Sequence, residues 1–578
     1  MQLARRFRIP ALFCALAVLV CELVSRPYAN MSICDDGPYI LVAQTLADTG
    51  HLVYNGWPAA MLGWQLYLGA AFIKLFGFSF TSVRMSMVLV AMVMAFFLQR
   101  TLVRAGITER NATLGTLAFV LSPLYLMLSA TYMTDITGLF AIVICLYGCL
   151  RALQAATDRA AIAWLCFAVA TNAVGGTARQ IAWLGLLVIV PSTLWLLRVR
   201  RRVLLAGSGA TLAGVLFIFT CVHWFARQPY IQPERLIPSA FPIAHVLGQF
   251  TYLFLDAPFL LLPLFAIFLP QIRRATPRVL TGIAAIFAAY LFLALYPSHL
   301  RGDFPLEPML FNGNWVSVHG IYEGVVSLSD WHSTPPLFLH TGVRIVLTLA
   351  SLGGVIGLLV SLSRMSSTPS SPRSNGVLSW RALAALLVPV TAAYIVILLP
   401  RSTGLIFDRY LLPLLLFATI VLVRYYQERV HPRLSIVCAS LVCVMAIYGI
   451  ACTHNMFSLY RARVALAAEL RASGVPETSV DNGWEYNLDV ELQHSNHINF
   501  PTIVIPANAY VPVPPPLSTG CKMLWYNYTP HIHPLYGVSF QPDVCAGPAP
   551  FAPVHYSRWL AASPGTLYAV RYTRSSKP

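Results

Sequence analysis

Two adjacent carboxylates, Asp35 and Asp36, follow the first hydrophobic segment of the chain, in the stretch Cys34-Asp35-Asp36-Gly37-Pro38-Tyr39. An acid at a membrane surface costs free energy unless it is paired, solvated or functional, and the chain has only 22 Asp and Glu residues in 578. A carboxylate placed here can act as a general base that takes a proton from a hydroxyl. The structural alternative is an Asx turn that caps a helix beginning near Pro38.

Other charged residues with suitable chemistry lie at the ends of later apolar segments. They are Asp135 in Tyr132-Met133-Thr134-Asp135, Arg179, Arg401, and Arg409 with Tyr410. Arginine holds phosphate groups through charge-assisted hydrogen bonds, so acids and arginines on one membrane face would suit the reaction of a lipid-linked phosphosugar with a hydroxyl. Two structural alternatives stand beside this interpretation. Asp135 could cap the helix that starts beside it, and Arg409 with Tyr410 could be a pair that reaches toward the membrane interface.

The composition predicts a membrane protein with many spanning helices. Hydrophobic residues make up 57% of the chain and charged residues 11%, whereas a soluble domain has roughly 25% charged residues. The net charge of +17 does not indicate nucleic-acid binding, because the basic residues are scattered at the ends of apolar segments and form no run with interleaved aromatics. They are more typical of signals for membrane orientation.

The positions of the arginines predict how the chain crosses the membrane. Arg5, Arg6 and Arg8 precede an apolar segment from about Ile9 to Leu23, which we interpret as an uncleaved first helix with its amino end in the cytoplasm. The apolar stretch from Trp57 to Gly77 is long enough to span a bilayer. If it crossed, later arginine clusters would face outward against the positive-inside rule. We therefore predict that this stretch lies in the outer interface.

Further apolar segments have the length of about 17–25 residues that a bilayer requires. With the first helix they predict about thirteen spans, the others near residues 82–99, 112–130, 134–150, 160–175, 180–197, 203–224, 253–271, 279–297, 341–363, 382–400, 405–424 and 434–453. Residues 1–454 would form this polytopic all-α transmembrane domain, with a first outer loop at 27–81 that carries interfacial helices and another outer loop at 297–340. Residues 455–578 would form a C-terminal extracytoplasmic α+β domain.

The C-terminal region is predicted to begin with an amphipathic helix, about Tyr460 to Ala472, and to continue as short strands. An odd number of crossings places it outside the cytoplasm, where Cys521 and Cys545 can form a disulfide. The alternative is two free thiols. His531-Ile532-His533 has a spacing that could hold a metal on a strand, but the sequence offers no nearby Cys or carboxylate pair, so we assign no metal site.

An ordered set of these motifs resembles the GT-C glycosyltransferases, and more narrowly the branch of protein O-mannosyltransferases, aminoarabinose transferases and Rgt-type enzymes (family 39-like). The resemblance covers about residues 8–150 and 409–413 and does not extend to the C-terminal region. The residues that carry it are Asp35-Asp36-x-x-Tyr39, Ala43, Gly50, Lys74-Leu75-Phe76-Gly77, Arg84, Thr134-Asp135 and Arg409-Tyr410-Leu411-Leu412-Pro413.

The resemblance implies roles for individual residues. In the family the first-loop acid is the proposed general base, usually within Asp-Glu-x-x-Tyr, so Asp35 matches the catalytic aspartate and Asp36 stands where glutamate is usual. Asp135 matches the second-loop acid, which with Tyr39 would organise the site or the acceptor. The motif that begins at Arg409 suits donor phosphate binding. Position and chemistry alone add Arg179 and Arg401 to the phosphate ligands.

The sequence thus predicts an integral, multi-pass glycosyltransferase of the plasma (inner) membrane. The resemblance implies a polyprenyl-phosphate donor, from which the enzyme would move a sugar to a hydroxyl of a lipid, glycan or protein acceptor at the outer face, by inverting displacement. No cofactor is required by this logic, and a divalent metal is possible without being indicated. The predicted partners are therefore donor, acceptor and membrane lipids, and not nucleic acid. The alternatives are a secondary transporter, which would place charges near the bilayer midplane, and an inactive GT-C-like scaffold.

Overall fold

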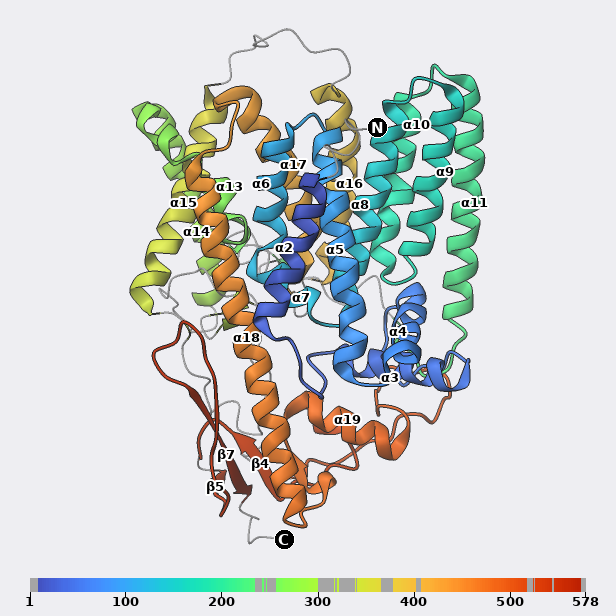
Figure 1. Cartoon of the computed structure of the whole chain (residues 1–578), viewed down its shortest axis with the longest axis vertical. Coiled ribbons are helices and arrows are strands. Elements are labelled where there is room, and N and C mark those ends of the chain that lie inside the picture. Colours follow the sequence, from blue (N-terminus) through green and yellow to red (C-terminus); the bar gives the residue numbers. More distant parts are fainter. Residues whose placement is uncertain are drawn as a thin grey trace.

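The computed structural model describes most of the chain between residues 9 and 572. Helices dominate the described part and run along the long axis of the molecule, with a small sheet and α19 (Gly483–Ser495) at one end (Figure 1). The larger segments outside the described residues are 234–241, 247–255, 300–315, 322–337, 365–377, 402–406 and 517–522. The predicted outer loop at 297–340 falls mainly within them; its described parts include β1 (Val316–Ser317) and β2 (Gly320–Ile321).

Seven of the described helices are long and apolar enough to cross a membrane, or eight if one bent pair counts as a single span. They are α5 (Phe80–Arg104), α8 (Thr134–Leu153), α11 (Arg201–Phe225), α15 (Thr341–Ser363), α16 (Trp380–Arg401), α17 (Leu412–Tyr425) with its flanking turns, and α18 (Ile436–Ala472). Shorter apolar segments are α2 (Ile9–Ser25), Gln180–Leu196 and Pro277–Ala289 within α14 (Pro277–His299). The chain is a mostly helical, multi-pass membrane protein, but the predicted number of about thirteen spans is not confirmed.

Several predicted spans are interrupted. The segment predicted at 112–130 is divided into α6 (Glu109–Val120) and α7 (Pro123–Ser129), which are bent by 70°. The physical reason is Pro123, because proline disfavours helical geometry in the residue before it and donates no backbone hydrogen bond. Ser122 then caps α7 by accepting a hydrogen bond from the amide of Tyr125.

Two other predicted spans, at 180–197 and 253–271, are irregular. In the second, Asp256, Pro258 and Pro263 interrupt the apolar run, and the sequence predicts a helix there that begins late or is broken. Residues 180–197 form a 3₁₀ turn (η1, Gln180–Trp183), a π turn (η2, Gly185–Ile189) and the short α10 (Val190–Leu196). Between 253 and 271 the described residues include α13 (Leu262–Ala266) and the start of a 3₁₀ segment (η3, Leu269–Arg274). The neighbouring α9 (Asp158–Gly175) is regular and packs against α8 and α11.

The first outer loop contains two short helices, α3 (Asp36–Thr49) and α4 (Gly63–Phe76), each of 14 residues. Fourteen residues extend about 21 Å, which is less than the hydrocarbon thickness of about 30 Å. The stretch from Trp57 to Gly77 therefore forms no spanning helix, as predicted. Gly50 ends α3 with a φ of +74°, a conformation that glycine adopts without steric cost. Figure 1 places both helices at the same end of the bundle as α19.

The longest helix, α18, connects the bundle with the C-terminal region. Its 37 residues extend about 55 Å, well beyond the hydrocarbon thickness of about 30 Å. The predicted domain boundary at 454/455 falls inside this helix, and the amphipathic helix predicted at Tyr460–Ala472 is its last part. The prediction of a separate helix was wrong, because no glycine or proline lies between residues 450 and 472 to end the span.

The C-terminal region contains α19 and a small mixed sheet, in agreement with the predicted α+β composition. The strands are β3 (Val480–Asp481), β4 (Tyr536–Ser539), β5 (Ala546–Pro548), β6 (Val554–Tyr556) and β7 (Gly565–Tyr572). The sheet order is β3-β4-β7-β5, with β3 parallel to β4, and β6 also pairs with β7. Cys545 forms a disulfide, and its predicted partner Cys521 lies outside the described residues.

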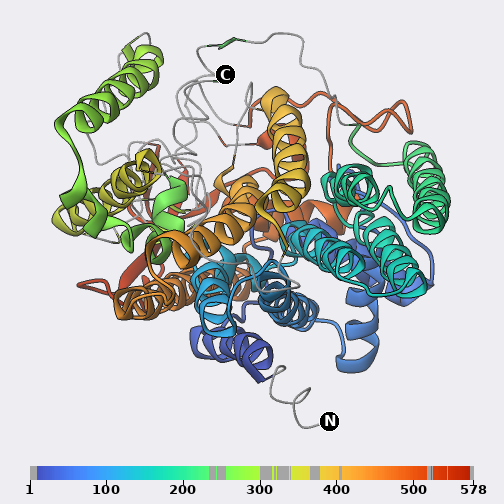
Figure 2. The ribbon, with the colours of Figure 1, turned by 90° about the horizontal axis from the view of Figure 1, so that it is seen from above.

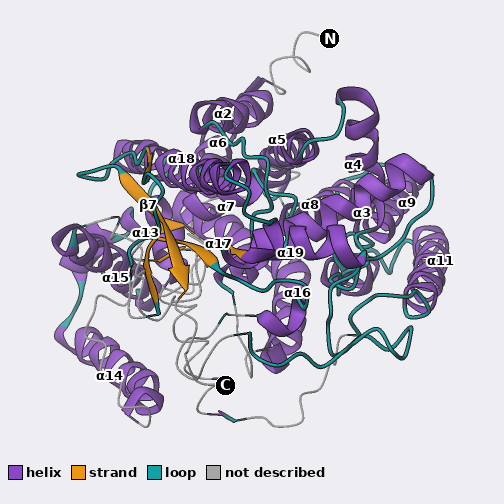
Figure 3. Ribbon diagram, turned by 90° about the horizontal axis from the view of Figure 1, so that it is seen from below, coloured by secondary structure: helices purple, strands orange, loops and turns teal. Residues whose placement is uncertain are grey.

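The C-terminal region covers one end of the helix bundle. Seen from that end, α19 and the sheet lie across the ends of the helices, and α19 lies beside α3 (Figure 3). From the opposite end, α9 and α11 lie on one side of the bundle, and α14 and α15 on the other (Figure 2). Most site residues predicted from the sequence are found where α3, α8 and α17 begin, at the covered end; Arg179 directly precedes η1, and Arg401 is the last residue of α16.

Candidate functional site

The two carboxylates of the first outer loop point to different partners. Cys34 has a φ of +54°, a left-handed conformation that is uncommon outside glycine, and it turns the chain immediately before Asp35. Asp35 occupies the N-cap position of α3 but makes no capping hydrogen bond with its side chain. The structural alternative predicted for this residue, an Asx cap, is therefore not what its carboxylate does.

Asp36 is fully buried and its carboxylate is fully engaged. Arg84 donates to both oxygens, with Nε to Oδ2 at 2.7 Å and a second guanidinium nitrogen to Oδ1 at 2.9 Å. The backbone amides of Ile33 and Tyr132 add hydrogen bonds of 2.7 and 3.2 Å. Arg84 also donates to the carbonyl oxygens of Ala29 and Met31. This bidentate pair ties the loop to α5, and it leaves Asp36 poorly placed to accept a proton from a substrate.

Asp35 has a more open environment. Its side chain is 20% exposed, and the nearest guanidinium nitrogen of Arg409 is 3.6 Å from Oδ2. That distance is longer than a hydrogen bond of about 2.7–3.2 Å, so the pair is held by charge more than by directed bonding. Burial raises the pKa of Asp35 above its ordinary value, and the positive charge of Arg409 opposes that increase. Asp35 is thus a partly exposed carboxylate with increased basicity next to a cation.

Asp135 joins the two arginines on the other side of the site. It lies in the first turn of α8, whose N-cap is Met133, so it does not cap this helix through its own side chain. A guanidinium nitrogen of Arg179 lies 2.5 Å from its Oδ1, and one of Arg409 lies 3.8 Å from its Oδ2. Asp135 therefore holds Arg179 firmly and Arg409 loosely.

The ring of Tyr410 lies near both arginines. Arg409 and Tyr410 belong to a 3₁₀ turn (η4, Asp408–Leu411) that leads into α17. The guanidinium carbon of Arg179 is 5.3 Å from the centre of this ring and that of Arg409 is 5.6 Å from it, within the range of cation–π attraction. The side chain of Arg409 is only 6% exposed. It therefore does not reach toward the membrane interface, as the structural alternative for Arg409 and Tyr410 predicted.

The remaining predicted site residues are Tyr39 and Arg401. Tyr39 is buried in α3, and burial, followed by the charge of Asp35, raises its pKa well above the usual value. Arg401 is the last residue of α16, and its side chain lies outside the described residues. The structure thus brings together Asp35, Tyr39, Asp135, Arg179, Arg409 and Tyr410, and it turns Asp36 away from them.

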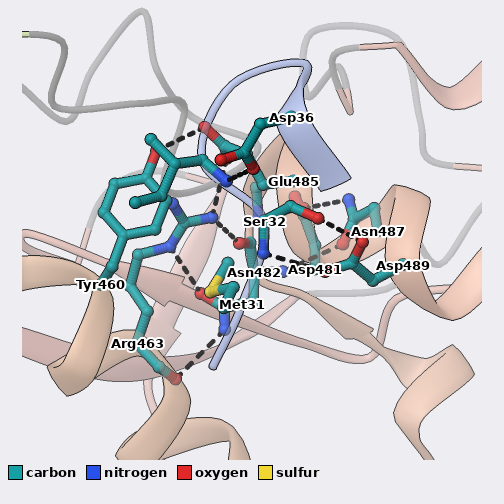
Figure 4. Close-up of polar contacts among 12 residues, drawn as sticks. Met31, Ser32, Asp36, Tyr460, Arg463, Asp481, Asn482, Glu485, Asn487 and Asp489 are labelled. Atoms are coloured by element: carbon teal, nitrogen blue, oxygen red, sulfur yellow. Dashed lines mark hydrogen bonds and ion pairs between the residues drawn. The ribbon is translucent and has the colours of Figure 1, made fainter. Parts of the chain in front are cut away.

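A polar cluster beneath the site was not predicted from the sequence. Arg463 of α18 and Glu485 of α19 form a fully buried ion pair of 3.0 Å, and the hydroxyl of Tyr460 donates to Glu485 at 2.5 Å. Asp489, one turn along α19, accepts from the amide and hydroxyl of Ser32 in the first outer loop (Figure 4). The signal in the sequence was the pair of acids at 485 and 489, which share one face of a helix.

The histidine motif of the C-terminal region has an ordinary partner. Nδ1 of His531 lies 2.8 Å from a carboxylate oxygen of Glu491. Across the described residues, no group of three or more His, Cys, Asp and Glu side chains is arranged to hold a metal ion. Neither observation assigns a metal to this region.

Comparisons with known proteins return no matching family model and no matching curated protein. Among solved structures, the chain is similar to ArnT from Cupriavidus metallidurans bound to undecaprenyl phosphate, with a TM-score of 0.40 and 16% identity over 83% of this chain and 84% of that chain. An oligosaccharyltransferase from Archaeoglobus fulgidus has a TM-score of 0.44 and 15% identity, over 90% of this chain and 62% of that chain.

The protein O-mannosyltransferase Pmt1-Pmt2 complex of S. cerevisiae, bound to the sugar donor, is a third similar structure. Its TM-score is 0.32 and its identity 13%, over 38% of this chain and 34% of that chain. These similar structures are GT-C glycosyltransferases, the class that the sequence motifs resemble. Every one of these TM-scores is below 0.5, so neither a family nor an activity of this chain follows from the similarities alone.

Proposed function

We propose that the protein is a membrane glycosyltransferase of the GT-C type, which transfers a sugar from a polyprenyl-phosphate donor to an acceptor hydroxyl. The observation that carries the proposal is the position of Asp35. It is a partly exposed carboxylate of raised pKa, 3.6 Å from Arg409, and Arg409 lies with Arg179 around Tyr410. A carboxylate and two guanidinium groups therefore lie close together, and this arrangement supports the proposed roles of one base and two phosphate ligands.

The arginines are suited to bind the donor phosphate. Asp35 and Asp135 supply two negative charges, and Arg179 and Arg409 two positive ones, so the group is neutral before a donor enters. The ion pairs of Arg409, at 3.6 and 3.8 Å, are longer than charge-assisted hydrogen bonds of about 2.7–2.9 Å. A phosphate oxygen can offer Arg409 a shorter bond than either acid does, while Asp135 keeps Arg179 in place.

The proposed reaction is a single displacement at the anomeric carbon. The acceptor oxygen attacks that carbon as Asp35 takes its proton, and the bond from the sugar to the phosphate oxygen breaks. The lipid phosphate leaves with the bonding electron pair, its charge offset by Arg179 and Arg409. Attack opposite the leaving group inverts the configuration. Phosphate is a serviceable leaving group, and the arginines can supply the positive charge that a metal would.

The orientation that we propose places the site at the outer membrane face. The C-terminal region would then be extracytoplasmic and the amino end cytoplasmic. In support, the turn between α5 and α6 and the turn between α10 and α11 lie at the opposite end of the bundle (Figure 1). These turns and the helix ends beside them carry arginines, among them Arg104, Arg110, Arg198 and Arg200, as expected for the cytoplasmic side. A secondary transporter is disfavoured, because the site charges gather at a bundle end rather than along its middle.

The test is the variant Asp35→Asn, in which the amide keeps the shape of the side chain but cannot accept the proton. The full-length protein would be reconstituted with radiolabelled polyprenyl-phosphate hexoses and pentoses and with lipid and polysaccharide fractions as acceptors. We expect transfer to fall by about 10²–10⁴-fold, the usual contribution of a general base, with little change in binding of polyprenyl phosphate.

The matched control is Asp48→Asn, because Asp48 is an exposed acid on the same helix. This variant should transfer like the unmodified protein. Full transfer by Asp35→Asn, measured beside an unchanged thermal unfolding temperature, would contradict the assigned base. Absence of transfer by the unmodified protein from every polyprenyl-phosphate donor would contradict the proposed function.

A further inference from the structure

A large groove lies at the end of the bundle opposite the C-terminal region. Its volume is about 1140 Å³, slightly above the roughly 300–1,000 Å³ of common ligand pockets. Its lining comes from the last turns of α5, the turn from α5 into α6, the last turns of α8 and the first half of α9. Helix α8 packs against both α5 and α9. The groove is therefore remote from Asp35 and has no part in the reaction proposed above.

The groove combines aromatic walls with arginines. The aromatic side chains belong to helices of the bundle, and the arginines lie at or near the helix ends. The lining residues that matter here are Phe96, Phe97, Tyr147, Trp164 and Phe167 among the aromatics, and Arg100, Arg104 and Arg151 among the cations. From Phe96 to Arg104 the wall of α5 extends about 12 Å along the helix axis. Because aromatic side chains line this wall and arginines lie at its end, a ligand that filled the groove would have an apolar part and an anionic end.

The cations of the groove have few acidic partners. The carboxylate of Glu109 is bound by Arg100 at 2.9 Å and by Gln99 at 2.7 Å. For Arg104 and Arg151, no ion pair with a carboxylate is found among the described residues. Arg104 interacts with the hydroxyl of Tyr147 and donates a long bond of 3.4 Å to Gln154, and its Nε is buried without a hydrogen-bond partner in the described part of the chain.

Arg151 is held by aromatic rings in place of an acid. Its guanidinium carbon is 4.3 Å from the ring centre of Trp164, and it donates to the hydroxyl of Tyr147 at 3.0 Å. Arg104 lies close enough to Arg151 and Arg100 for their charges to act on it. Like charges gathered where water is partly excluded repel one another, and an anion between them would relieve that repulsion.

We propose that this groove binds an anionic phospholipid, with the phosphate between Arg104 and Arg151 and an acyl chain along the aromatic wall. Two features favour a lipid over a soluble phosphate: α5 and α8, which form much of the wall, are long and apolar enough to cross a membrane, and the cations lie at or near the ends of these helices. Basic pockets between helices at a membrane surface bind anionic headgroups in this way. The helix C-termini on their own favour arginines, but that effect does not explain the aromatic groove beside them.

The test compares Arg104→Gln/Arg151→Gln with a control of equal charge change, Arg201→Gln/Arg202→Gln. The control arginines are exposed and lie at the same end of the bundle. Each full-length protein would be placed in nanodiscs of phosphatidylcholine, alone or with phosphatidylglycerol. Retained lipid would be counted by native mass spectrometry, and the unfolding temperature would be measured. We expect retention of phosphatidylglycerol to weaken by at least about tenfold in the groove variant, since charge-assisted bonds are strong, and to change little in the control.

The unfolding temperatures give a second readout. In phosphatidylcholine alone, the groove variant should be at least as stable as the unmodified protein, because glutamine removes the repulsion. With phosphatidylglycerol, the unmodified protein should be the more stable of the two. If the double variant does not fold, each single variant is measured in the same way.

Three results would overturn the proposal. The first is equal retention of phosphatidylglycerol by the groove and control variants. The second is the same stabilisation by inorganic phosphate, which would indicate a soluble anion. The third is displacement of phosphatidylglycerol by an equimolar amount of polyprenyl phosphate, which would indicate a site for the substrate lipid.

Discussion

Asp35 and Asp36 are neighbours in the chain, and each lies near an arginine, yet the two pairs differ in almost every physical respect. The pair of Asp36 with Arg84 is fully buried, bidentate and completed by two backbone amides. The pair of Asp35 with Arg409 is partly exposed and 3.6 Å long. A carboxylate whose oxygens are all engaged in hydrogen bonds holds a loop in place. A carboxylate with unused hydrogen-bonding capacity is available to a substrate. The same residue type at adjacent positions thus acquires different tasks from its partners alone.

The largest expected effect is on the stability of the protein when the buried ion pair of Asp36 with Arg84 is broken. Asp36→Asn or Arg84→Met leaves one charge buried without its partner, which typically costs about 3–5 kcal/mol. We expect a strong fall in the unfolding temperature and in the yield of folded protein. The double variant Asp36→Leu/Arg84→Met, which removes both charges, should recover part of that stability. If Asp36→Asn unfolds at the normal temperature but is inactive, the roles of the two acids are exchanged.

Variants of Arg409, the partner of Asp35, and of Arg179 should change substrate binding more than the stability of the protein. Arg409→Ala and Arg179→Ala each remove charge-assisted hydrogen bonds worth about 1.5–3 kcal/mol, so the affinity for polyprenyl phosphate should fall by roughly 10- to 100-fold. Lysine should restore only part of it, because it lacks the planar fork of the guanidinium. Titration of the purified variants with polyprenyl phosphate measures the effect. Unchanged affinity in both alanine variants would remove these arginines from the donor site.

The sequence predicted that the acids and arginines would gather, because each follows or precedes an apolar segment on the same predicted membrane face. It could not distinguish Asp35 from Asp36 by contacts, since Arg84 lies 48 positions away and reads as part of a span. It also missed Glu485 of α19, which pairs with Arg463 of α18 and whose charge raises the pKa of Asp35. Hydropathy locates apolar segments, but whether they are continuous, broken or bent depends on packing and on residues such as Pro123.

A smaller effect is expected in the pH dependence of transfer. Asp35 must be ionised to accept a proton, so activity should rise with pH through the pKa of Asp35. Burial raises that pKa, so the midpoint should lie above the ordinary aspartate value of about 4. Arg409 lowers the pKa, and Arg409→Ala should therefore move the midpoint to higher pH. The measurement is the rate of transfer against pH at saturating donor. A midpoint that stays in place in the variant would show that the titrating group is not Asp35.

The smallest expected effect concerns a third acid that touches the same loop. Asp489 accepts hydrogen bonds from Ser32, but no arginine of the described residues forms an ion pair with it, unlike Asp36. Burial raises the pKa of Asp489 to about 7, whereas in an unfolded chain it would be about 4. Between those values the folded state binds more protons than the unfolded state. The free energy of unfolding should therefore decrease as pH rises from about 4 to about 7 and then level off.

Asp489→Asn removes this titration, so the contribution of the residue to stability should no longer vary across that window. The amide oxygen can still accept one of the two hydrogen bonds from Ser32, and the variant should therefore fold. Unfolding temperatures of both proteins at a series of pH values measure the difference, with Asp48→Asn as the exposed control. A pH dependence that is identical in the unmodified protein and in Asp489→Asn would mean that this acid is ionised throughout. Asp489 would then hold α19 against the first outer loop as an ionised carboxylate, as Asp36 holds the loop against α5.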